Sequence, residues 1–387
     1  MKNNKKQIVE GSHAVAEVIK NCQVDVISAY PITPQTHIVE DLERMKAEGK
    51  ADFEYIRADS EFAAASIVLG ASATGVRTYT ATCSQGLLLM TEVLFCIAGL
   101  RLPIVLTCAN RAVSAPISIW NDQQDAVTLR DSGWLQLYGE TNQEVVDLHI
   151  LAYKLAESMM LPVMVNMDGF VLTHTYEPIE ISKESVIKKY LPKYKPPQNT
   201  ILDVNNPRSL GDFAAPDVYM EIRQELHEDV LSSKKQITKL AQELKKIFGR
   251  SIGDNGLFES YKLNDADIVL VAMGSVCGTI KEVIDNQRGK GQKVGLLKVI
   301  SLRPFPDEEI VEALKKAKYI AVLDKSISMG SEGVLAIDLK RAAYTKLKAK
   351  IQSFIIGLGG RDVTEKMIIK IINSVKKQDN KIQFIGE

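Results

Sequence analysis

The stretch that decides the fold is Ser28-Ala29-Tyr30-Pro31-Ile32-Thr33-Pro34-Gln35-Thr36, which joins a strand pattern to a helix pattern. Residues 24–27 before it predict a short buried strand, and residues 37–45 after it carry apolar side chains at helical spacing. Thr33 followed by Pro34 predicts a helix N-cap with proline in the first turn. Such a helix start offers free amide groups and a positive dipole end to a carboxylate or phosphate. On local chemistry alone, the alternative is that Thr33 only caps its helix.

Length and composition are those of an ordinary globular protein. The chain has 387 residues, too many for one hydrophobic core, so we expect two domains. Hydrophobic residues make up 45% of it, and 48 Lys plus Arg balance 48 Asp plus Glu. Zero net charge gives no reason to expect nucleic acid or an anionic membrane as a partner. Without a membrane-spanning apolar run, and with an N-terminus unlike a signal peptide, the chain is expected to be cytoplasmic.

The cysteines predict a reducing compartment. They are Cys22, Cys83, Cys96, Cys108 and Cys277, and none belongs to a C-x-x-C pair. Most have apolar neighbours, which is typical of cysteines that act as small core residues. An iron–sulfur cluster needs clustered thiolates, so we expect none within this chain.

Further strand patterns occur at residues 53–56, 76–81, 103–107 and 161–170. Their alternation with helix patterns predicts an α/β fold with a mainly parallel sheet. In such sheets, ligands bind beyond the carboxyl ends of the strands. The polar residues expected at these ends are Thr33, Glu61, Ser84, Gln85 and Arg111.

The domain organisation is predicted from a change of character near the middle of the chain. Residues 1–177 form the first expected domain. Residues 178–256 are expected to be a proline-rich linker, draped over a surface, and a connecting helix over residues 217–248. Residues 257–387 repeat the alternation of strands and helices and form the second expected domain.

Glu61 is the first candidate for catalysis. It follows a strand pattern and lies in the first turn of an alanine-rich helix, where small and apolar neighbours would exclude water from its carboxylate. The alternative is a solvated acid that merely interacts with the helix dipole, which is the common case for glutamate in a first turn.

A series of motifs extends this pattern over nearly the whole chain. They are residues 30–36 (Tyr-Pro-Ile-Thr-Pro-Gln-Thr), 60–61, 82–87, 99–105, 110–112, 118–125, 168–170, 303–306 (Arg-Pro-Phe-Pro) and 357–362 (Gly-Leu-Gly-Gly-Arg-Asp). In this order the chain resembles the 2-oxoacid:ferredoxin oxidoreductase family, and within it the alpha subunits of pyruvate:ferredoxin oxidoreductases. Each motif alone is weak, but the ordered set is specific.

The resemblance implies a fold and a reaction. The expected fold is a thiamine-diphosphate-binding domain of the pyrimidine type plus an α/β domain like the transketolase C-terminal domain. The expected reaction is oxidative decarboxylation of pyruvate with coenzyme A to acetyl-CoA, CO₂ and reduced ferredoxin. By resemblance, Glu61 activates thiamine, Thr33 contacts the 2-oxoacid and Arg111 binds its carboxylate. Ile119 is expected to line the substrate pocket, with Ser84 and Gln85 on the cofactor side.

The resemblance also implies what partner subunits supply. Thiamine diphosphate would be shared with a beta subunit, because the Gly-Asp-Gly motif of its Mg²⁺-bound diphosphate site is missing here. Mg²⁺ and [4Fe-4S] clusters are expected in partner subunits, with no metal held by this chain. Gamma and delta subunits complete the expected complex, and ferredoxin or flavodoxin is the expected electron acceptor.

Departures from the family pattern leave alternatives open. Phe62 stands where the family commonly has histidine, and Gln123 replaces another frequent histidine. The substrate could be another 2-oxoacid, namely 2-oxoisovalerate, 2-oxoglutarate or oxalate. Residues 273–278 weakly suggest a nucleotide-binding turn, although they lack the G-x-G-x-x-G spacing. A non-catalytic scaffold subunit is the remaining alternative, and it predicts that Glu61 and Arg111 can be replaced without loss of turnover.

Overall fold

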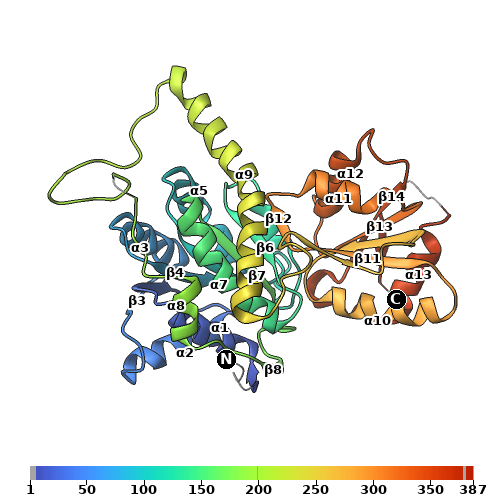
Figure 1. The fold of residues 1–387 in the computed structure, drawn as a ribbon, viewed down its shortest axis with the longest axis horizontal. Coiled ribbons are helices and arrows are strands. Elements are labelled where there is room, and N and C mark those ends of the chain that lie inside the picture. The colour runs from blue at the N-terminus through green and yellow to red at the C-terminus, as the bar shows by residue number, and fades with distance from the viewer. Residues whose placement is uncertain (1–5, 198, 378–380, 387) are drawn as a thin grey trace.

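The computed structural model describes residues 6–197, 199–377 and 381–386. Figure 1 shows two lobes, each built on a sheet that helices cover, with the long helix α9 (Pro216–Phe248) lying along the first lobe. The chain has an α/β fold, as predicted. Both sheets are mainly parallel.

The first lobe contains a seven-stranded sheet. In spatial order its strands are β12 (Ser301–Arg303), β6 (Leu135–Tyr138), β7 (Val163–Asp168), β5 (Val105–Asn110), β4 (Thr78–Thr82), β2 (Val26–Ala29) and β3 (Glu54–Arg57). The helices of this lobe are α1 (Gly11–Asn21), α2 (Thr36–Ala47), α3 (Glu61–Ala73), α4 (Ser84–Leu89), α5 (Thr91–Gly99), α6 (Gln124–Thr128) and α7 (Asn142–Met159).

Two details of the first lobe stand out. The helical stretch that begins at Ser84 breaks at Met90 into α4 and α5. The Thr91 hydroxyl donates to the carbonyl of Leu88, a local bond of the kind that competes with helix continuation. The second detail is β12, which comes from the second half of the chain and pairs antiparallel with β6. The two lobes therefore interlock.

The segment expected to be a linker is partly regular. Strand β8 (Tyr176–Ile179) pairs antiparallel with β1 (Gln7–Glu10), and α8 (Glu184–Tyr190) packs against α9. The connecting helix begins at Pro216, where proline in the first turn costs no hydrogen bond, and runs for 33 residues. The outer end of α9 stands clear of the first lobe (Figure 1), whereas the loop before it contacts this lobe where the N–H of Leu202 donates to the carbonyl of Ala73 at 2.8 Å. The domain boundaries at 177/178 and 256/257 stay predictions.

The second lobe contains a six-stranded sheet. Its strands in spatial order are β15 (Gln383–Ile385), β14 (Lys350–Ile356), β13 (Tyr319–Asp324), β10 (Ile268–Ala272), β11 (Val294–Val299) and β9 (Phe258–Tyr261). Helices α10 (Val276–Gly289) and α13 (Glu365–Ser374) cover one face, while α11 (Asp307–Leu314) and α12 (Val334–Ala343) cover the other. A short turn of 3-10 helix, η1 (Leu358–Gly360), follows β14.

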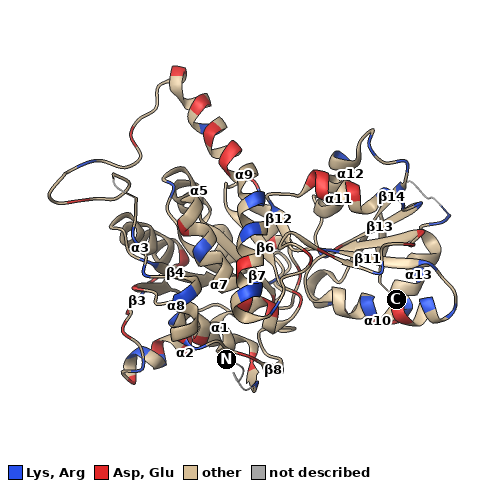
Figure 2. Ribbon diagram, viewed as in Figure 1, with Lys and Arg blue, Asp and Glu red and all other residues tan. Residues whose placement is uncertain are grey.

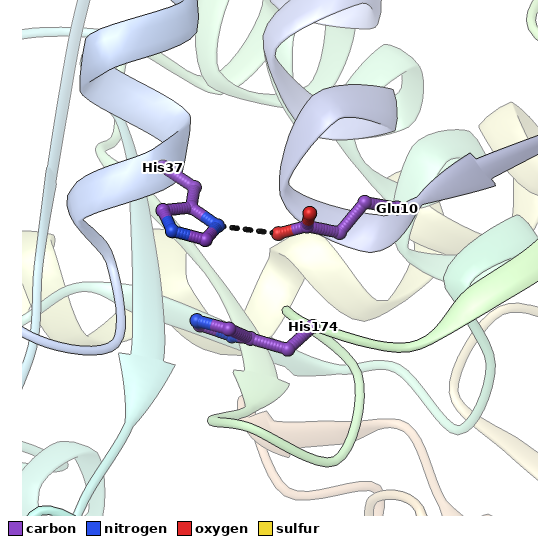
Figure 3. A group of neighbouring side chains, drawn as sticks. All are labelled: Glu10, His37 and His174. Atoms are coloured by element: carbon purple, nitrogen blue, oxygen red, sulfur yellow. Dashed lines mark hydrogen bonds and ion pairs between the residues drawn. The ribbon is translucent and has the colours of Figure 1, made fainter.

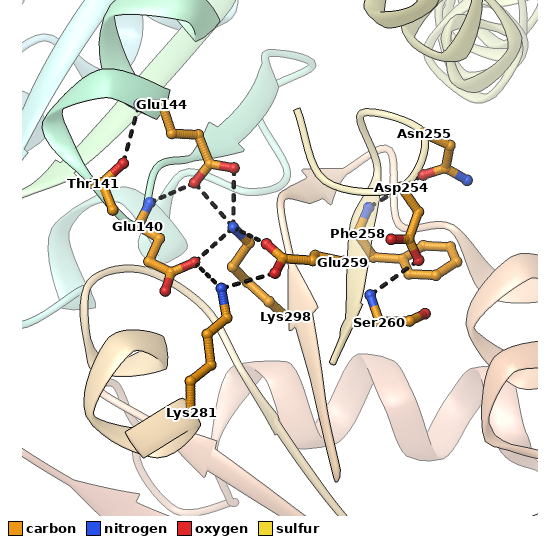
Figure 4. Close-up of polar contacts among 10 residues, drawn as sticks. All are labelled: Glu140, Thr141, Glu144, Asp254, Asn255, Phe258, Glu259, Ser260, Lys281 and Lys298. Atoms are coloured by element: carbon orange, nitrogen blue, oxygen red, sulfur yellow. Dashed lines mark hydrogen bonds and ion pairs between the residues drawn. The ribbon is translucent and has the colours of Figure 1, made fainter. Parts of the chain in front are cut away.

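A buried cluster of ion pairs joins the lobes (Figure 4). Lys298 on β11 lies 2.7 Å from Glu140 and 3.0 Å from Glu144 of the first lobe, and 2.6 Å from Glu259 of the second. Lys281 on α10 also pairs with Glu140 and Glu259. Burial acts to lower the pKa of Lys298, but the three carboxylates outweigh it and raise this pKa above its usual range. Lys298 therefore stays charged and holds the lobes together.

Charges are mixed over most of the molecule (Figure 2). An exception is the outer part of α9, where acidic residues follow one another at Asp217, Glu221, Glu225, Glu228 and Asp229. Within the described residues, no helix combines the length and the apolar character needed to cross a membrane.

Candidate active site

The turn after β2 is held by Gln35. Its side chain is fully buried, and it donates to the carbonyl of Ala81 at 2.7 Å and accepts from the N–H of Ile32 at 3.2 Å. Helix α2 has Gln35 as its N-cap, so the prediction that Thr33 caps this helix is wrong. The reason is a separate turn before the helix, closed by the N–H of Gln35 and the carbonyl of Ile32 at 2.8 Å. Thr33 lies at the corner of that turn and is exposed.

Arg111 connects this turn to the loop after β5. Its side chain is buried, and Nη1 donates to the main-chain carbonyl of Thr33 at 2.8 Å. Nε donates to the carbonyl of Ser118 at 2.9 Å. Because a guanidinium carries N–H groups on three nitrogens, further donors remain on the same group for a carboxylate. The carbonyl of Thr33 also accepts from the Cys83 thiol, at 3.2 Å.

Asp125 fixes the loops after β4 and β5 to each other. It is fully buried, and its Oδ2 accepts from the N–H of Ser84 and from the N–H of Arg111, both at 2.9 Å. Its Oδ1 accepts from Asn110 at 3.0 Å. Burial raises the pKa of Asp125, although these hydrogen bonds act in the opposite direction. One carboxyl group thus sets the distance between Ser84 and Arg111.

Ser84 and Gln85 bind the loop after β5. The Ser84 hydroxyl contacts the Gln85 side chain and lies 2.5 Å from the carbonyl of Ala112. Gln85 Nε2 donates to the hydroxyl of Ser114 at 2.5 Å. Ser84 has φ 49°, in the left-handed region, which costs a non-glycine residue about 1–2 kcal/mol. Residues held in such conformations cluster at functional sites.

Glu61 opens α3 and is largely buried, with 7% of its surface exposed. Its carboxylate lies against α4, where a Cβ added to Gly86 would stand 2.5 Å from Glu61 Oε1 and 2.5 Å from Thr82 Oγ1. The carboxylate therefore occupies space that is open only because residue 86 is glycine. Among the described residues, the buried Thr82 hydroxyl has no hydrogen-bond partner. The buried Glu61 carboxylate and the unpaired Thr82 hydroxyl together suit a polar heterocyclic ligand, which would form hydrogen bonds with both groups.

Ile119 lies in the loop after β5 and is 39% exposed. This loop is closed by the N–H of Ala112, which donates to the carbonyl of Trp120 at 3.0 Å. The Trp120 ring packs at a tilt of 44° against Phe170 from the loop after β7, with ring centroids 4.7 Å apart. Ile119 is therefore presented at the open side of the site, next to the Ser118 carbonyl that holds Arg111.

The second lobe supports the same loop. Lys325 donates to the side chain of Asn121, and its carbonyl accepts from the N–H of Gln123 at 2.8 Å. Asp122 accepts from the N–H of Gly359 at 3.1 Å. Burial raises the pKa of Asp122 to about 6. Gln123, one of the departures from the family pattern, thus lies where the lobes meet.

The turn at residues 273–278 also belongs to this junction. Asp168 accepts from the N–H of Ser275 at 3.0 Å and from Gln123 Nε2 at 3.2 Å. Burial alone would raise the pKa of Asp168, but the charge of Lys325 and these hydrogen bonds lower it below its usual value. Gly274 has φ +76°, and a Cβ there would stand 2.5 Å from Gln123 Nε2. First-lobe side chains therefore lie against Gly274, and Asp168 takes the Ser275 N–H that a phosphate would need at this turn.

The structure brings every site residue expected from the sequence to one edge of the first sheet. These residues are Thr33, Glu61, Ser84, Gln85, Arg111 and Ile119. Their roles stay predictions. Sequence reasoning missed Gln35, Gly86 and Asp125, which shape the site from behind. All three residues belong to the motifs quoted from the sequence. Their roles could not be predicted, because each depends on a buried contact with a residue far away in the sequence.

Two family profiles match the chain. The profile described as pyruvate flavodoxin/ferredoxin oxidoreductase, thiamine diphosphate-binding, matches residues 17–242. The profile described as pyruvate:ferredoxin oxidoreductase core domain II matches residues 266–368. The first lobe therefore contains a thiamine-diphosphate-binding domain of this family.

Curated relatives match at nearly full length. Pyruvate synthase subunit PorA of Methanocaldococcus jannaschii is 50% identical over 384 residues, which cover 98% of this chain and 97% of the relative. The same subunit of Methanosarcina barkeri is 50% identical over 376 residues, covering 96% and 92%. Ketoisovalerate oxidoreductase subunit VorA of Pyrococcus horikoshii is 42% identical over 373 residues, covering 96% and 94%.

A solved structure agrees on the fold. A chain of the 2-oxoglutarate:ferredoxin oxidoreductase of Magnetococcus marinus superposes with a TM-score of 0.72 at 20% identity. The superposition covers 96% of this chain, which spans 65% of the length of that one. With a matching profile over more than half of the chain and relatives at 50% identity, this chain belongs to the pyruvate flavodoxin/ferredoxin oxidoreductase family.

Proposed function

We propose that this chain is the alpha subunit of a multi-subunit pyruvate:ferredoxin oxidoreductase. It contributes the pyrimidine half of a thiamine diphosphate site and the 2-oxoacid pocket. The main support for the proposal is the position of the buried Glu61 carboxylate, which lies against Gly86 at the same sheet edge as Arg111. The identity of 50% to pyruvate synthase subunits supports pyruvate as the substrate.

Thiamine diphosphate, when bound, supplies the carbon nucleophile and the electron sink for decarboxylation of a 2-oxoacid. Glu61 would hold a proton at a ring nitrogen of the aminopyrimidine, the task for which a water-excluded carboxylate is suited. The Thr82 hydroxyl, unpaired among the described residues, is a further donor or acceptor toward that ring. Ser84 and Gln85 keep the loop after β5 beside the cofactor.

The substrate pocket is assigned to the turn after β2 and the loop after β5. Arg111 would bind the 2-oxoacid carboxylate in the plane of its guanidinium. The exposed Thr33 hydroxyl is placed to hydrogen-bond the same substrate, and Ile119 offers an apolar contact to the methyl group of pyruvate. The products would be acetyl-CoA, CO₂ and reduced ferredoxin or flavodoxin, with coenzyme A as the acyl acceptor.

Partner subunits would complete this site. Large apolar side chains are exposed on the segments that surround it: Tyr30, Phe62, Leu89, Ile117 and Trp120. Exposed apolar groups of this size mark interaction surfaces. A beta subunit would cover them and bring the diphosphate half, Mg²⁺ and a [4Fe-4S] cluster, and gamma and delta subunits would extend the electron path. The second lobe would serve assembly, and the complex would work in the cytoplasm.

A second candidate is the same chemistry on another 2-oxoacid. The ketoisovalerate oxidoreductase subunit at 42% identity favours 2-oxoisovalerate as that substrate, ahead of 2-oxoglutarate or oxalate. It is less favoured than pyruvate because the pyruvate synthase subunits are more similar to this chain.

The test is an assay of the native complex, purified without oxygen through a tag on this chain. We would measure coenzyme A-dependent reduction of a low-potential viologen dye with pyruvate, 2-oxoisovalerate, 2-oxoglutarate and oxalate. Pyruvate should give the highest turnover, and Glu61→Gln should lower it by roughly 10²–10⁴-fold. Glu54→Gln, an exposed glutamate on β3, is the matched control. Preference for another acid would correct the pocket, and full activity of Glu61→Gln would leave only the scaffold alternative.

A further inference from the structure

A cluster of metal-ligating side chains lies beside the Thr33 turn, outside the residues assigned to the proposed active site. Glu10 ends β1, His37 lies in the first turn of α2, and His174 lies in the loop between β7 and β8. One ligand atom of each residue lies within 4.8 Å of the other two. Figure 3 shows the Glu10 and His37 side chains pointing toward each other, with the ring of His174 beside them.

His37 and Glu10 are already paired. The Nδ1–H of His37 donates to Glu10 Oε1 at 2.6 Å. A cation can take the place of the proton that these two side chains share. Once that proton has moved to Nε2, the lone pair of Nδ1 lies on the side of the ring where Glu10 Oε1 lies, so both residues face the same position.

His174 is oriented by its neighbour. Its Nδ1 lies 2.7 Å from the Thr173 hydroxyl, which also accepts from the N–H of Phe170 at 2.8 Å. A hydroxyl oxygen has two acceptor lone pairs, so it can take both N–H groups. With its proton on Nδ1, His174 has a free lone pair on Nε2. The rings of His37 and His174 lie with centroids 4.6 Å apart.

The backbone holds two of the three residues in place without a metal. Strands β1 and β8 pair so that Glu10 faces Tyr176, and the N–H of Gly11 donates to the carbonyl of Thr175 at 3.1 Å. The N–H of Ser12 donates to the carbonyl of Thr173 at 2.9 Å. A surface hollow of ≈ 460 Å³, lined in part by Glu10, His37 and His13, opens next to the cluster and gives a cation a route in.

We propose that Glu10, His37 and His174 bind one divalent cation of the zinc class. Two imidazole nitrogens and a carboxylate oxygen are a donor set that suits Zn²⁺, and three protein ligands leave a fourth position to water. With metal–ligand bonds of about 2.0–2.2 Å, tetrahedral ligand atoms stand about 3.3 Å apart. Small rotations of the exposed His37 side chain and the partly buried Glu10 side chain close the remaining gap. The cation ties the start of α2, next to the Thr33 turn, to the β1–β8 ribbon.

The test is a titration of the full chain with Zn²⁺ alone. The chain carries Cys96→Ser, because Cys96 is an exposed thiol that could bind zinc by itself. Competition with a chromophoric chelator measures affinity, and thermal unfolding with and without zinc measures stabilisation. We expect one tightly bound zinc per chain. Glu10→Gln, His37→Ala and His174→Ala should each weaken binding by about ten-fold or more and abolish the rise in Tm.

Two histidines serve as controls. His13 borders the same hollow but pairs with Asp41 at 3.0 Å, and His227 lies on α9. His13→Ala and His227→Ala should keep the wild-type affinity. His37 is half-exposed, so its replacement decides the matter if the His174 variant does not fold. No saturable site, equal affinity in His37→Ala, or equal loss in His13→Ala would each overturn the proposal and leave the cluster as a hydrogen-bonded pair beside a stacked ring.

Discussion

Arg111 donates from Nη1 to the main-chain carbonyl of Thr33 at 2.8 Å, although 78 residues separate the two in sequence. The same guanidinium donates from Nε to the carbonyl of Ser118. Arg111 is therefore held on two sides before any substrate arrives. A pre-ordered arginine loses less conformational freedom when a carboxylate binds, which favours affinity.

The first prediction concerns this arginine. Arg111→Lys keeps the charge but removes the planar set of donors, so lysine cannot hold both carbonyls and also grip a carboxylate. Loss of one charge-assisted hydrogen bond is worth about 1.5–3 kcal/mol, so the KM for the 2-oxoacid should rise roughly 10–100-fold. Initial rates of dye reduction by the native complex over a range of 2-oxoacid concentrations measure this change.

The matched control for the arginine is Arg288→Lys on α10, whose guanidinium also donates to main-chain carbonyls, at 2.7 Å, but in the second lobe. Its KM should equal that of the wild type. If Arg111→Lys lowers kcat and leaves the KM unchanged, Arg111 acts through the loop structure and the substrate carboxylate binds elsewhere.

The second prediction concerns pH and Asp324. This carboxyl group ends β13 fully buried and accepts from the N–H groups of Leu335 and Ala336 at 2.8 and 3.2 Å. Burial raises its pKa from 3.8 to about 7, despite these bonds. Between these values the folded chain keeps a proton that the unfolded chain has released. This proton therefore stabilises the folded chain fully below pH 4. As the pH rises from there toward 7, the free energy of unfolding falls by about 1.4 kcal/mol per pH unit.

Asp324→Asn should remove this dependence, because the amide carries no titrating proton. Urea unfolding of the wild type and the variant at several pH values between about 4.5 and 7 gives the two slopes. The slope of the variant should be less negative by about 1.4 kcal/mol per pH unit. Asp362→Asn, at an exposed position, should leave the slope unchanged. Equal slopes for the wild type and Asp324→Asn would mean that Asp324 is ionised in the folded chain throughout.

The sheet and its functional edge could be predicted from the sequence because their signals are local. Strands β2, β4, β5 and β7 are buried along nearly their whole length, which is typical of parallel strands covered on both faces, and apolar residues predominate in β2, β5 and β7. Once the strands are parallel, the residues after them must meet at one edge. Thr33, Glu61 and Arg111 could therefore be brought together without knowledge of any contact between them.

Features decided by distant partners could not be predicted in this way. Thr33 and Gln35 both suit a helix start, and only the carbonyl of Ala81, from a neighbouring strand, selects Gln35. Strands β8 and β12 are short, and they exist because β1 and β6 offer an edge to pair with. The partners of the turn at residues 273–278 are equally distant in sequence, since Gln123 and Asp168 of the other lobe lie against Gly274.

The last prediction tests whether the position of the Glu61 carboxylate against Gly86 is needed for turnover. In Gly86→Ala, the new methyl group would stand 2.5 Å from Glu61 Oε1 and 2.8 Å from Glu61 Cγ, closer than carbon and oxygen atoms approach without displacement. The carboxylate must then move, while alanine is otherwise a better helix residue than glycine in α4. We expect turnover of the native complex to fall at least ten-fold, with little change in its Tm.

Gly70→Ala, on the same helix as Glu61, separates this effect from helix propensity. Its added Cβ meets nothing within 4 Å, so it should stabilise α3 by about 0.5–1 kcal/mol and leave turnover unchanged. If Gly86→Ala alone keeps full turnover, the carboxylate does not need this position, and Glu61 is then an ordinary first-turn acid rather than the group that serves the cofactor.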